Sequence, residues 1–182
     1  MPSVSIKFDD TALQAKLNAL QEKLQEAVRP SAQAGAQVFY DEVKSNVAAL
    51  GTKTGNLNKS IYQVFAERFS GAAYATYYVS WNRKKAQHGH LVEYGHIQRY
   101  KAYIGSDGNW YTAVRAGMRG QPAPNRKAPQ SVKDAYYVPL SSPRQIAAQA
   151  FIRPAYESKK RTALKASKAK FLELAKGAIN GA

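Results

Sequence analysis

The chain has 182 residues, of which 45% are hydrophobic, and it carries a formal net charge of +15 with no cysteine. This length suits a single domain with a real core, and the lack of cysteine excludes disulfides, thiolate nucleophiles and cysteine-ligated metals. No run approaches the ~20 apolar residues of a membrane span, so we expect no membrane contact.

Two helices are predicted in the first fifty residues, after a weakly alternating stretch over residues 3–8 that suggests a short strand. The first helix is marked by apolar residues three or four apart: Leu13, Leu17, Leu20, Leu24 and Val28. Pro30 is expected to end it, because the residue before a proline is pushed out of the helical region. A second helix is expected from Pro30 to about residue 50.

Five stretches rich in β-branched and aromatic residues follow: residues 61–65, 74–81, 100–104, 110–114 and 136–140. The Asp107-Gly108 pair between two of them is a strong hairpin signal. Three polar or basic stretches are read as loops: residues 51–60, 83–90 and 116–132.

A last helix is predicted over about residues 154–178. Leu164, Phe171 and Leu174 are expected to pack inward. The outer face is expected to carry Arg161, Lys165, Lys168 and Lys176.

Helices kept apart from strands that are joined by short turns indicate an α+β fold. The sequence therefore predicts one α+β domain over residues 1–182. Its parts would be two N-terminal helices, a mostly antiparallel sheet with long loops, and a basic C-terminal helix packed on the sheet. Residues 97–146 form a long excursion of loops and a hairpin.

The residues offer little for catalysis or for a cofactor. His90, Glu93 and His96 have a three-residue spacing that recurs in metal sites, but Gly89 and Gly95 weaken a helix there and no second carboxylate supports it. No serine lies in a nucleophile elbow and no glycine-rich loop leads into a Lys-Ser/Thr helix start. We expect no catalytic, metal or cofactor site. Glu93 is expected instead to form an ion pair or a satisfied polar contact.

The positive charge is concentrated in the C-terminal half. Residues 1–82 hold 8 basic and 7 acidic residues, whereas residues 83–134 hold 10 and 3 and residues 135–182 hold 9 and 2. This asymmetry favours a polyanionic partner; the alternative is a solvated lysine-rich surface.

Three motifs occur in a fixed order along the chain: Thr54-Gly55-Asn56-Leu57 with Ser60-Ile61, then His90-Leu91-Val92-Glu93-Tyr94-Gly95-His96, then Phe151-Ile152-Arg153-Pro154-Ala155-Tyr156-Glu157. Their order and their helical flanks resemble the phage tail-component family, also called head–tail joining or tail-completion proteins. Two features depart from the family pattern. His96 stands where the family has threonine, and residues 97–146 are longer than its minimal form.

The resemblance implies a structural virion protein of the phage neck or upper tail, assembled in the host cytoplasm, with no enzymatic activity and no cofactor. It implies a closed ring of copies of this chain, six-fold in the favoured case, around the DNA passage. Neighbouring partners would be head-closure and tail-terminator rings, with double-stranded DNA held non-specifically in the lumen. The alternative is a sequence-independent DNA-binding or DNA-packaging protein. An enzyme such as a nuclease is the third and least favoured class, because no carboxylate cluster is present.

Two groups of residues carry these expectations. The fold and assembly motif comprises Gly55, Asn56, Leu57, Glu93, Tyr94, Gly95, Phe151, Arg153 and Pro154. The basic residues expected to face the DNA channel or a partner are Arg83, Lys84, Lys85, Arg126, Lys127, Arg161, Lys165, Lys168 and Lys176.

Overall fold

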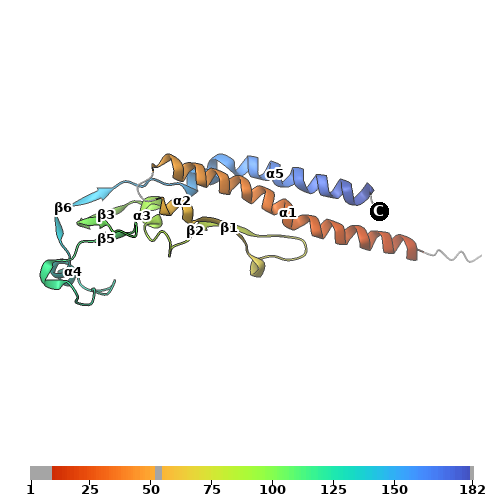
Figure 1. Ribbon diagram of the computed structural model, residues 1–182. Coiled ribbons are helices and arrows are strands. Elements are labelled where there is room, and N and C mark those ends of the chain that lie inside the picture. The colour runs from red at the N-terminus through yellow and green to blue at the C-terminus, as the bar shows by residue number, and fades with distance from the viewer. Residues whose placement is uncertain (1–9, 52–54, 181–182) are drawn as a thin grey trace, which may run out of the picture. The chain divides into compact units, whose positions relative to one another are not determined.

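The computed structural model describes residues 10–51 and 55–180 and shows a mixture of helices and short strands (Figure 1). The elements follow in the order α1 (Thr11–Ala49), α2 (Asn56–Ser60), β1 (Ile61–Phe65), η1 (Glu67–Phe69), β2 (Tyr77–Trp81), α3 (Gly89–Tyr94), β3 (His96–Tyr100), β4 (Ala102–Ile104), β5 (Trp110–Thr112), η2 (Ala116–Met118), α4 (Gln130–Tyr136), β6 (Pro139–Ile146) and α5 (Ile152–Asn180). The predicted α+β class is confirmed. The strand expected over residues 3–8 lies outside the described residues, as does Thr54 of the first motif.

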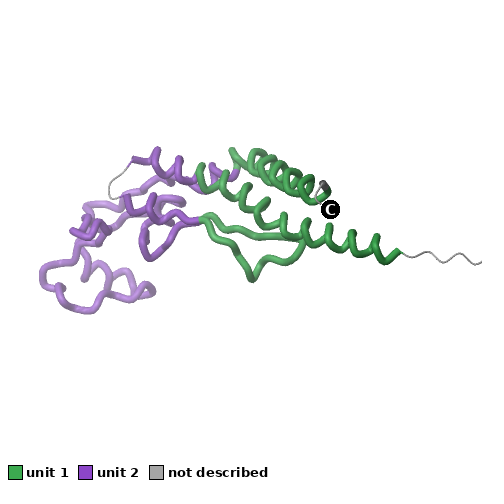
Figure 2. The backbone as a smooth tube through the Cα atoms, turned by 45° about the vertical axis from the view of Figure 1, so that its right-hand side comes forward, with its two compact units in different colours: residues 1–42, 63–79, 157–182 green, residues 43–62, 80–156 purple. Residues whose placement is uncertain are grey.

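The chain divides into two compact units, each built from separate stretches (Figure 2). Unit 1 comprises residues 1–42, 63–79 and 157–182, and unit 2 comprises residues 43–62 and 80–156. The two long helices α1 and α5 each contribute residues to both units. Among the described residues, no helix has the combination of length and apolar character that crossing a membrane requires.

In unit 1, α1 and α5 run side by side in opposite directions (Figures 1 and 2). Their seam consists of small residues: Ala27, Ser31 and Gly35 of α1 are buried, and so is Ala163 of α5. A Cβ atom added to Gly35 would lie 3.1 Å from the carbonyl oxygen of Ala163. Small side chains thus allow the two helix backbones to approach closely, and dispersion contacts between the closely packed atoms stabilise the pair.

The prediction that Pro30 ends a first helix is wrong. α1 is one continuous helix of 39 residues with Pro30 inside it. A proline within a helix removes one backbone hydrogen bond and costs about 3 kcal/mol. Ala27 and Ser31, on either side of Pro30, are both buried, so packing offsets that cost. Ser31 also donates its hydroxyl to the carbonyl of Ala27 at 2.6 Å.

The predicted inward face of the C-terminal helix is correct only in part. Phe171 and Leu174 are half-buried, but Leu164 is 71% exposed. The buried position is taken by the preceding residue, Ala163, whose small side chain fits the close seam with α1. Leu13 and Leu17, expected on the packed face of α1, are also exposed, at 56% and 55%.

The strands form three two-stranded sheets rather than the one sheet expected: β1–β2, β3–β6 and β4–β5. β3 pairs antiparallel with β6 from His96↔Ile146 to Tyr100↔Pro139, with an irregularity after Gln98. β4 pairs antiparallel with β5 and closes the predicted hairpin, in which Gly108 has a φ of 75°. In unit 1, α5 runs along α1, and Phe151, immediately before α5, packs against Trp81 of β2 in unit 2.

Short helices occupy two of the expected loops. The polar stretch 51–60 contains α2, and the basic stretch 116–132 begins with η2 and runs into α4. α4 and the preceding loop are tied together where Lys133 Nζ donates to the carbonyl of Arg126 at 2.7 Å and the Tyr136 hydroxyl donates to the carbonyl of Gln121 at 2.8 Å. The excursion over residues 97–146 therefore holds local structure made mainly of polar contacts.

Candidate functional site

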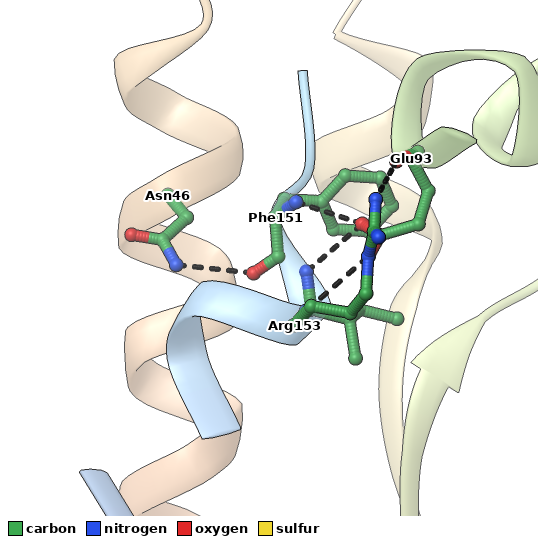
Figure 3. Close-up of polar contacts among 5 residues, drawn as sticks. Asn46, Glu93, Phe151 and Arg153 are labelled. Atoms are coloured by element: carbon green, nitrogen blue, oxygen red, sulfur yellow. Dashed lines mark hydrogen bonds and ion pairs between the residues drawn. The ribbon is translucent and has the colours of Figure 1, made fainter. Parts of the chain in front are cut away.

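The second and third sequence motifs meet in unit 2, at the start of α5 (Figure 3). Glu93, near the end of the short helix α3, is 2% exposed. Its side chain points at the first backbone N–H groups of α5, as Figure 3 shows. Residues almost sixty positions apart in the sequence are thus joined by one carboxylate.

The carboxylate of Glu93 accepts four hydrogen bonds. Its Oε2 accepts from the backbone N–H of Phe151 at 2.7 Å and of Ile152 at 3.0 Å. Its Oε1 accepts from the backbone N–H of Arg153 at 3.3 Å and from Nε of the same arginine at 3.2 Å. Nη2 of Arg153 also donates to the backbone carbonyl of Glu93 at 2.8 Å. Each carboxylate oxygen of Glu93 therefore accepts two hydrogen bonds, and Arg153 binds both the side chain and the backbone of Glu93.

This contact caps a helix. The first N–H groups of a helix lack partners within it and carry the positive end of the helix dipole. A buried carboxylate from another element satisfies them and their charge together. Burial raises the pKa of Glu93, but the hydrogen bonds from Ile152, Phe151 and Arg153 outweigh burial and leave the pKa below its ordinary value. Glu93 is therefore ionised at neutral pH, as a cap and ion-pair partner must be.

Three further contacts fix the start of α5 in unit 2. Phe151 is fully buried and packs edge-on against the ring of Trp81 in β2, with centroids 5.7 Å apart. Asn46 of α1 donates from Nδ2 to the carbonyl of Phe151 at 3.0 Å, as drawn in Figure 3. Arg153 lies over the ring of Tyr94 at 5.2 Å. The expectation that Phe151 anchors the helix start on a strand is confirmed.

Gly95 is required on two counts. Its φ of 70° lies in the region that side chains with a Cβ rarely adopt, and an added Cβ would lie 2.7 Å from the carbonyl oxygen of Ile146 and 2.8 Å from the nitrogen of Ala148. The backbone that leads into α5 therefore passes directly against Gly95. A hydrogen bond from Gln149 N to the Val92 carbonyl at 2.8 Å holds the same approach.

The first motif forms a separate joint in unit 2. Leu57 and Ile61 are buried, and Ser60 donates its hydroxyl to the Leu57 carbonyl at 2.7 Å. Asn56 donates from Nδ2 to the carbonyl of Gly108, in the β4–β5 turn, at 3.1 Å. Gly55, with a φ of 73°, precedes α2. These residues stabilise the fold around the hairpin.

The His-x-x-Glu-x-x-His spacing does not bring its three side chains together as a metal-ligating group in the described part of the chain. Glu93 is occupied by the helix start, and within residues 10–51 and 55–180 no group of three metal-ligating side chains comes together. The interpretation of Glu93 as an ion-pair partner is confirmed, with Arg153 as the partner.

The basic residues proposed from the sequence are all exposed and fall in both units. Arg83, Lys84, Lys85, Arg126 and Lys127 lie in turns of unit 2, whereas Arg161, Lys165, Lys168 and Lys176 lie on α5 in unit 1. Their prediction as residues facing DNA or a partner stays a prediction.

Trp81 and Asn46 were missed as parts of the site. Trp81 reads as one more aromatic residue of a strand, and Asn46 as one more polar residue of a helix. The sequence offered one signal, Gly89, because a glycine that opens a helix often marks a close approach by another group. In the structure that group is Trp81, whose Nε1 would lie 2.3 Å from a Cβ added to Gly89.

Comparison with known proteins bears on this arrangement. Residues 11–95, a little under half of the chain, match the model of a family described as "Bacteriophage HK97-gp10, putative tail-component". The match confirms the resemblance to phage tail components over these residues, which include the first motif and most of the second. Searches of curated proteins and of solved structures gave no significant match.

Proposed function

We propose that the chain is a structural subunit of the neck or upper tail of a long-tailed phage, acting in tail completion or head–tail joining. The family match supports a structural tail component of the virion. The finer assignment to the head–tail joint rests on the three ordered motifs, of which the match covers the first and most of the second.

The observation that carries a structural role is the use made of Glu93. Its carboxylate, a group that can act as a general acid or base, is buried and accepts four hydrogen bonds from the start of α5. A general acid or base has to reach a substrate proton. The most distinctive polar residue of the motifs therefore serves to hold elements together, which suits a non-enzymatic subunit.

Assembly is the second part of the proposal. Large apolar side chains are exposed on both units, among them Leu13 and Phe69 of unit 1 and Tyr103 and Trp110 of unit 2. In the described part of the chain every strand belongs to a two-stranded sheet, so each has one edge without a strand partner. Exposed apolar groups and open strand edges are features that partner subunits cover.

We propose a closed ring of copies, six-fold in the favoured case, that contacts head-closure and tail-terminator rings and surrounds the DNA. Closed cyclic symmetry is the usual outcome of head-to-tail contacts between copies. Exposed lysines and arginines in both units suit diffuse contact with phosphates, which steadies DNA without holding it against ejection.

Deletion of the gene from its phage tests this function. The expected product is unjoined heads and tails, with joining restored by adding the purified protein to the extract. Normal infectious particles from the deletion phage contradict the proposal.

The net charge of +15 favours one alternative, a free sequence-independent DNA-binding or DNA-packaging protein. Such a protein binds duplex DNA tightly as an isolated subunit, with an affinity that falls steeply with salt. The joining protein is expected to bind duplex weakly on its own. A titration of duplex DNA at several salt concentrations separates the two.

A further inference from the structure

The outer face of α5 combines positive charge with exposed large apolar side chains. Its cations are Arg161, Lys165, Lys168 and Lys176. Its apolar members are Leu164, Leu172 and Ile179, which are 71%, 46% and 61% exposed. We call these seven residues the outer α5 face. They lie away from the seam that Ala163 forms with α1, so the face is open in unit 1.

Its apolar members recur regularly. Leu164, Leu172 and Ile179 are eight and seven residues apart, which is about two helical turns at each step. They therefore lie along one side of the helix. Single exposed leucines are common on protein surfaces, but a repeated row of them on a helix is typical of a surface that another protein covers.

The cations of the face differ from the other lysines of the same helix. Lys160 pairs with Glu157 at 2.6 Å, Lys170 with Glu173 at 2.8 Å, and Lys159 with Glu42 of α1 at 3.3 Å. Among the described residues, no carboxylate lies within ion-pair distance of Arg161, Lys165, Lys168 or Lys176.

Helix stability does not explain this arrangement. Arg161 and Lys165 are four residues apart, and Lys165 and Lys168 are three apart, spacings at which like charges repel and destabilise a helix. The helix supplies a glutamate to its neighbouring lysines but not to these. The repulsion between these cations destabilises the helix, and no nearby glutamate offsets it. This unfavourable arrangement indicates that the charges have a function.

A second copy of this chain is a poor occupant. It carries 12 acidic residues against 27 basic ones. Several of the twelve are already engaged: Glu93 with Arg153, Glu42 with Lys159, and Asp107 and Asp134 with tyrosine hydroxyls. Duplex DNA alone is also a poor occupant, because a phosphate backbone gives the row of leucine and isoleucine nothing apolar to contact.

We propose that the outer α5 face docks on a different protein of the particle, whose surface carries carboxylates around an apolar strip. The carboxylates pair with the four cations, and the strip covers Leu164, Leu172 and Ile179. This inference rests on the proposed function, since it names the chemistry of a neighbour in the neck or tail. It assigns α5 to protein contact and leaves DNA contact to other basic residues.

Two triple variants test the proposal. The charge variant is Lys165→Glu, Lys168→Glu and Lys176→Glu, and the apolar variant is Leu164→Ser, Leu172→Ser and Ile179→Ser. A matched control reverses Lys59, Lys101 and Arg119 to Glu, which changes the net charge equally but uses exposed residues of unit 2 outside the predicted DNA-facing or partner-facing set. Circular dichroism and thermal melting establish that each variant is folded.

The probes are heads and DNA-free tails, purified separately from the encoding phage with this gene deleted. Binding of labelled protein to each is measured, together with binding to a duplex DNA and to vesicles containing anionic lipid. Both triple variants are expected to bind heads or tails more than about tenfold more weakly than the wild type, while the control keeps its affinity. The apolar variant is expected to bind duplex DNA as the wild type does.

Each other outcome is decisive. Wild-type protein that binds neither heads nor tails contradicts the proposed function, and the inference falls with it. Wild-type binding that both variants retain contradicts the inference alone. Loss in the charge variant with full binding by the apolar variant assigns the face to DNA or to charge steering. Loss of vesicle binding with particle binding intact assigns it to a membrane.

Discussion

Glu93 Oε2 lies 2.7 Å from the backbone nitrogen of Phe151, fifty-eight residues later in the chain. The contact connects the Val-Glu-Tyr-Gly motif to the Phe-Ile-Arg-Pro-Ala motif. It gives both a common physical reason, since one supplies the buried carboxylate and the other supplies the helix start that needs it. A variant at Glu93 should therefore affect folding before anything else.

Glu93→Ala is expected to lower the free energy of unfolding by about 2–3 kcal/mol, because the buried N–H groups at the start of α5 lose a charged acceptor. Urea unfolding followed by circular dichroism measures it. Glu157→Ala is the control. Its exposed ion pair with Lys160 is expected to contribute less than about 0.5 kcal/mol. Equal effects of the two substitutions contradict the capping role.

The same contact predicts a pH dependence. The pKa of Glu93 is lowered in the folded chain, so its contribution is fully present above the unfolded pKa of about 4.3. The contribution is lost as the pH falls from there through the folded pKa. Unfolding measured from neutral to acid pH should show a steeper loss of stability for the wild type than for Glu93→Gln. The pKa values of Asp107 and Asp134 are also lowered, so the difference between the two proteins is the relevant quantity. Parallel curves exclude Glu93 as the source.

Three glycine substitutions separate backbone strain from crowding. Gly117→Ala is expected to be neutral, since an added Cβ meets nothing within 4 Å. Gly120→Ala, with a φ of 84° and the same open space, is expected to cost about 1–2 kcal/mol. Gly95→Ala should cost more than Gly120→Ala, because its Cβ also meets backbone atoms. A Gly95 variant as stable as the Gly120 variant contradicts the close approach at the start of α5.

A pair of glycines in the two long helices tests the helix seam. Replacing a helical glycine by alanine normally stabilises the helix by up to about 1 kcal/mol. Gly177→Ala in α5, with open space around it, should raise the melting temperature. Gly35→Ala in α1 should lower it, because the added Cβ would meet Ser167 Oγ and the carbonyl of Ala163. A rise for both variants excludes close packing of α1 on α5.

The sequence predicted those elements whose cause is local. The β4–β5 hairpin follows from Asp107-Gly108, because the turn chemistry is contained in four residues. The continuous helix through Pro30 could not be predicted, since the proline rule is local, whereas the burial of Ala27 and Ser31 beside Pro30 is set by the tertiary fold.

The motif residues of the candidate site could be predicted from the sequence, but their arrangement could not. The motifs named Glu93, Phe151 and Arg153, and an ion pair was the right expectation for the glutamate. The direction of the contact was not predictable, because nothing local says that a carboxylate of α3 caps α5. The buried face of α5 was misread at Leu164 because a seam of small residues does not produce the pattern of large apolar side chains that marks a packed helix.

Imaging the chain in its particle tests the central claim most directly. Phage particles purified with the wild-type protein, and examined by electron cryomicroscopy at a resolution that shows α1 and α5, should contain a closed ring of this subunit around the DNA passage in the neck or upper tail. A particle that is complete and infectious but contains no copy of the chain contradicts the account.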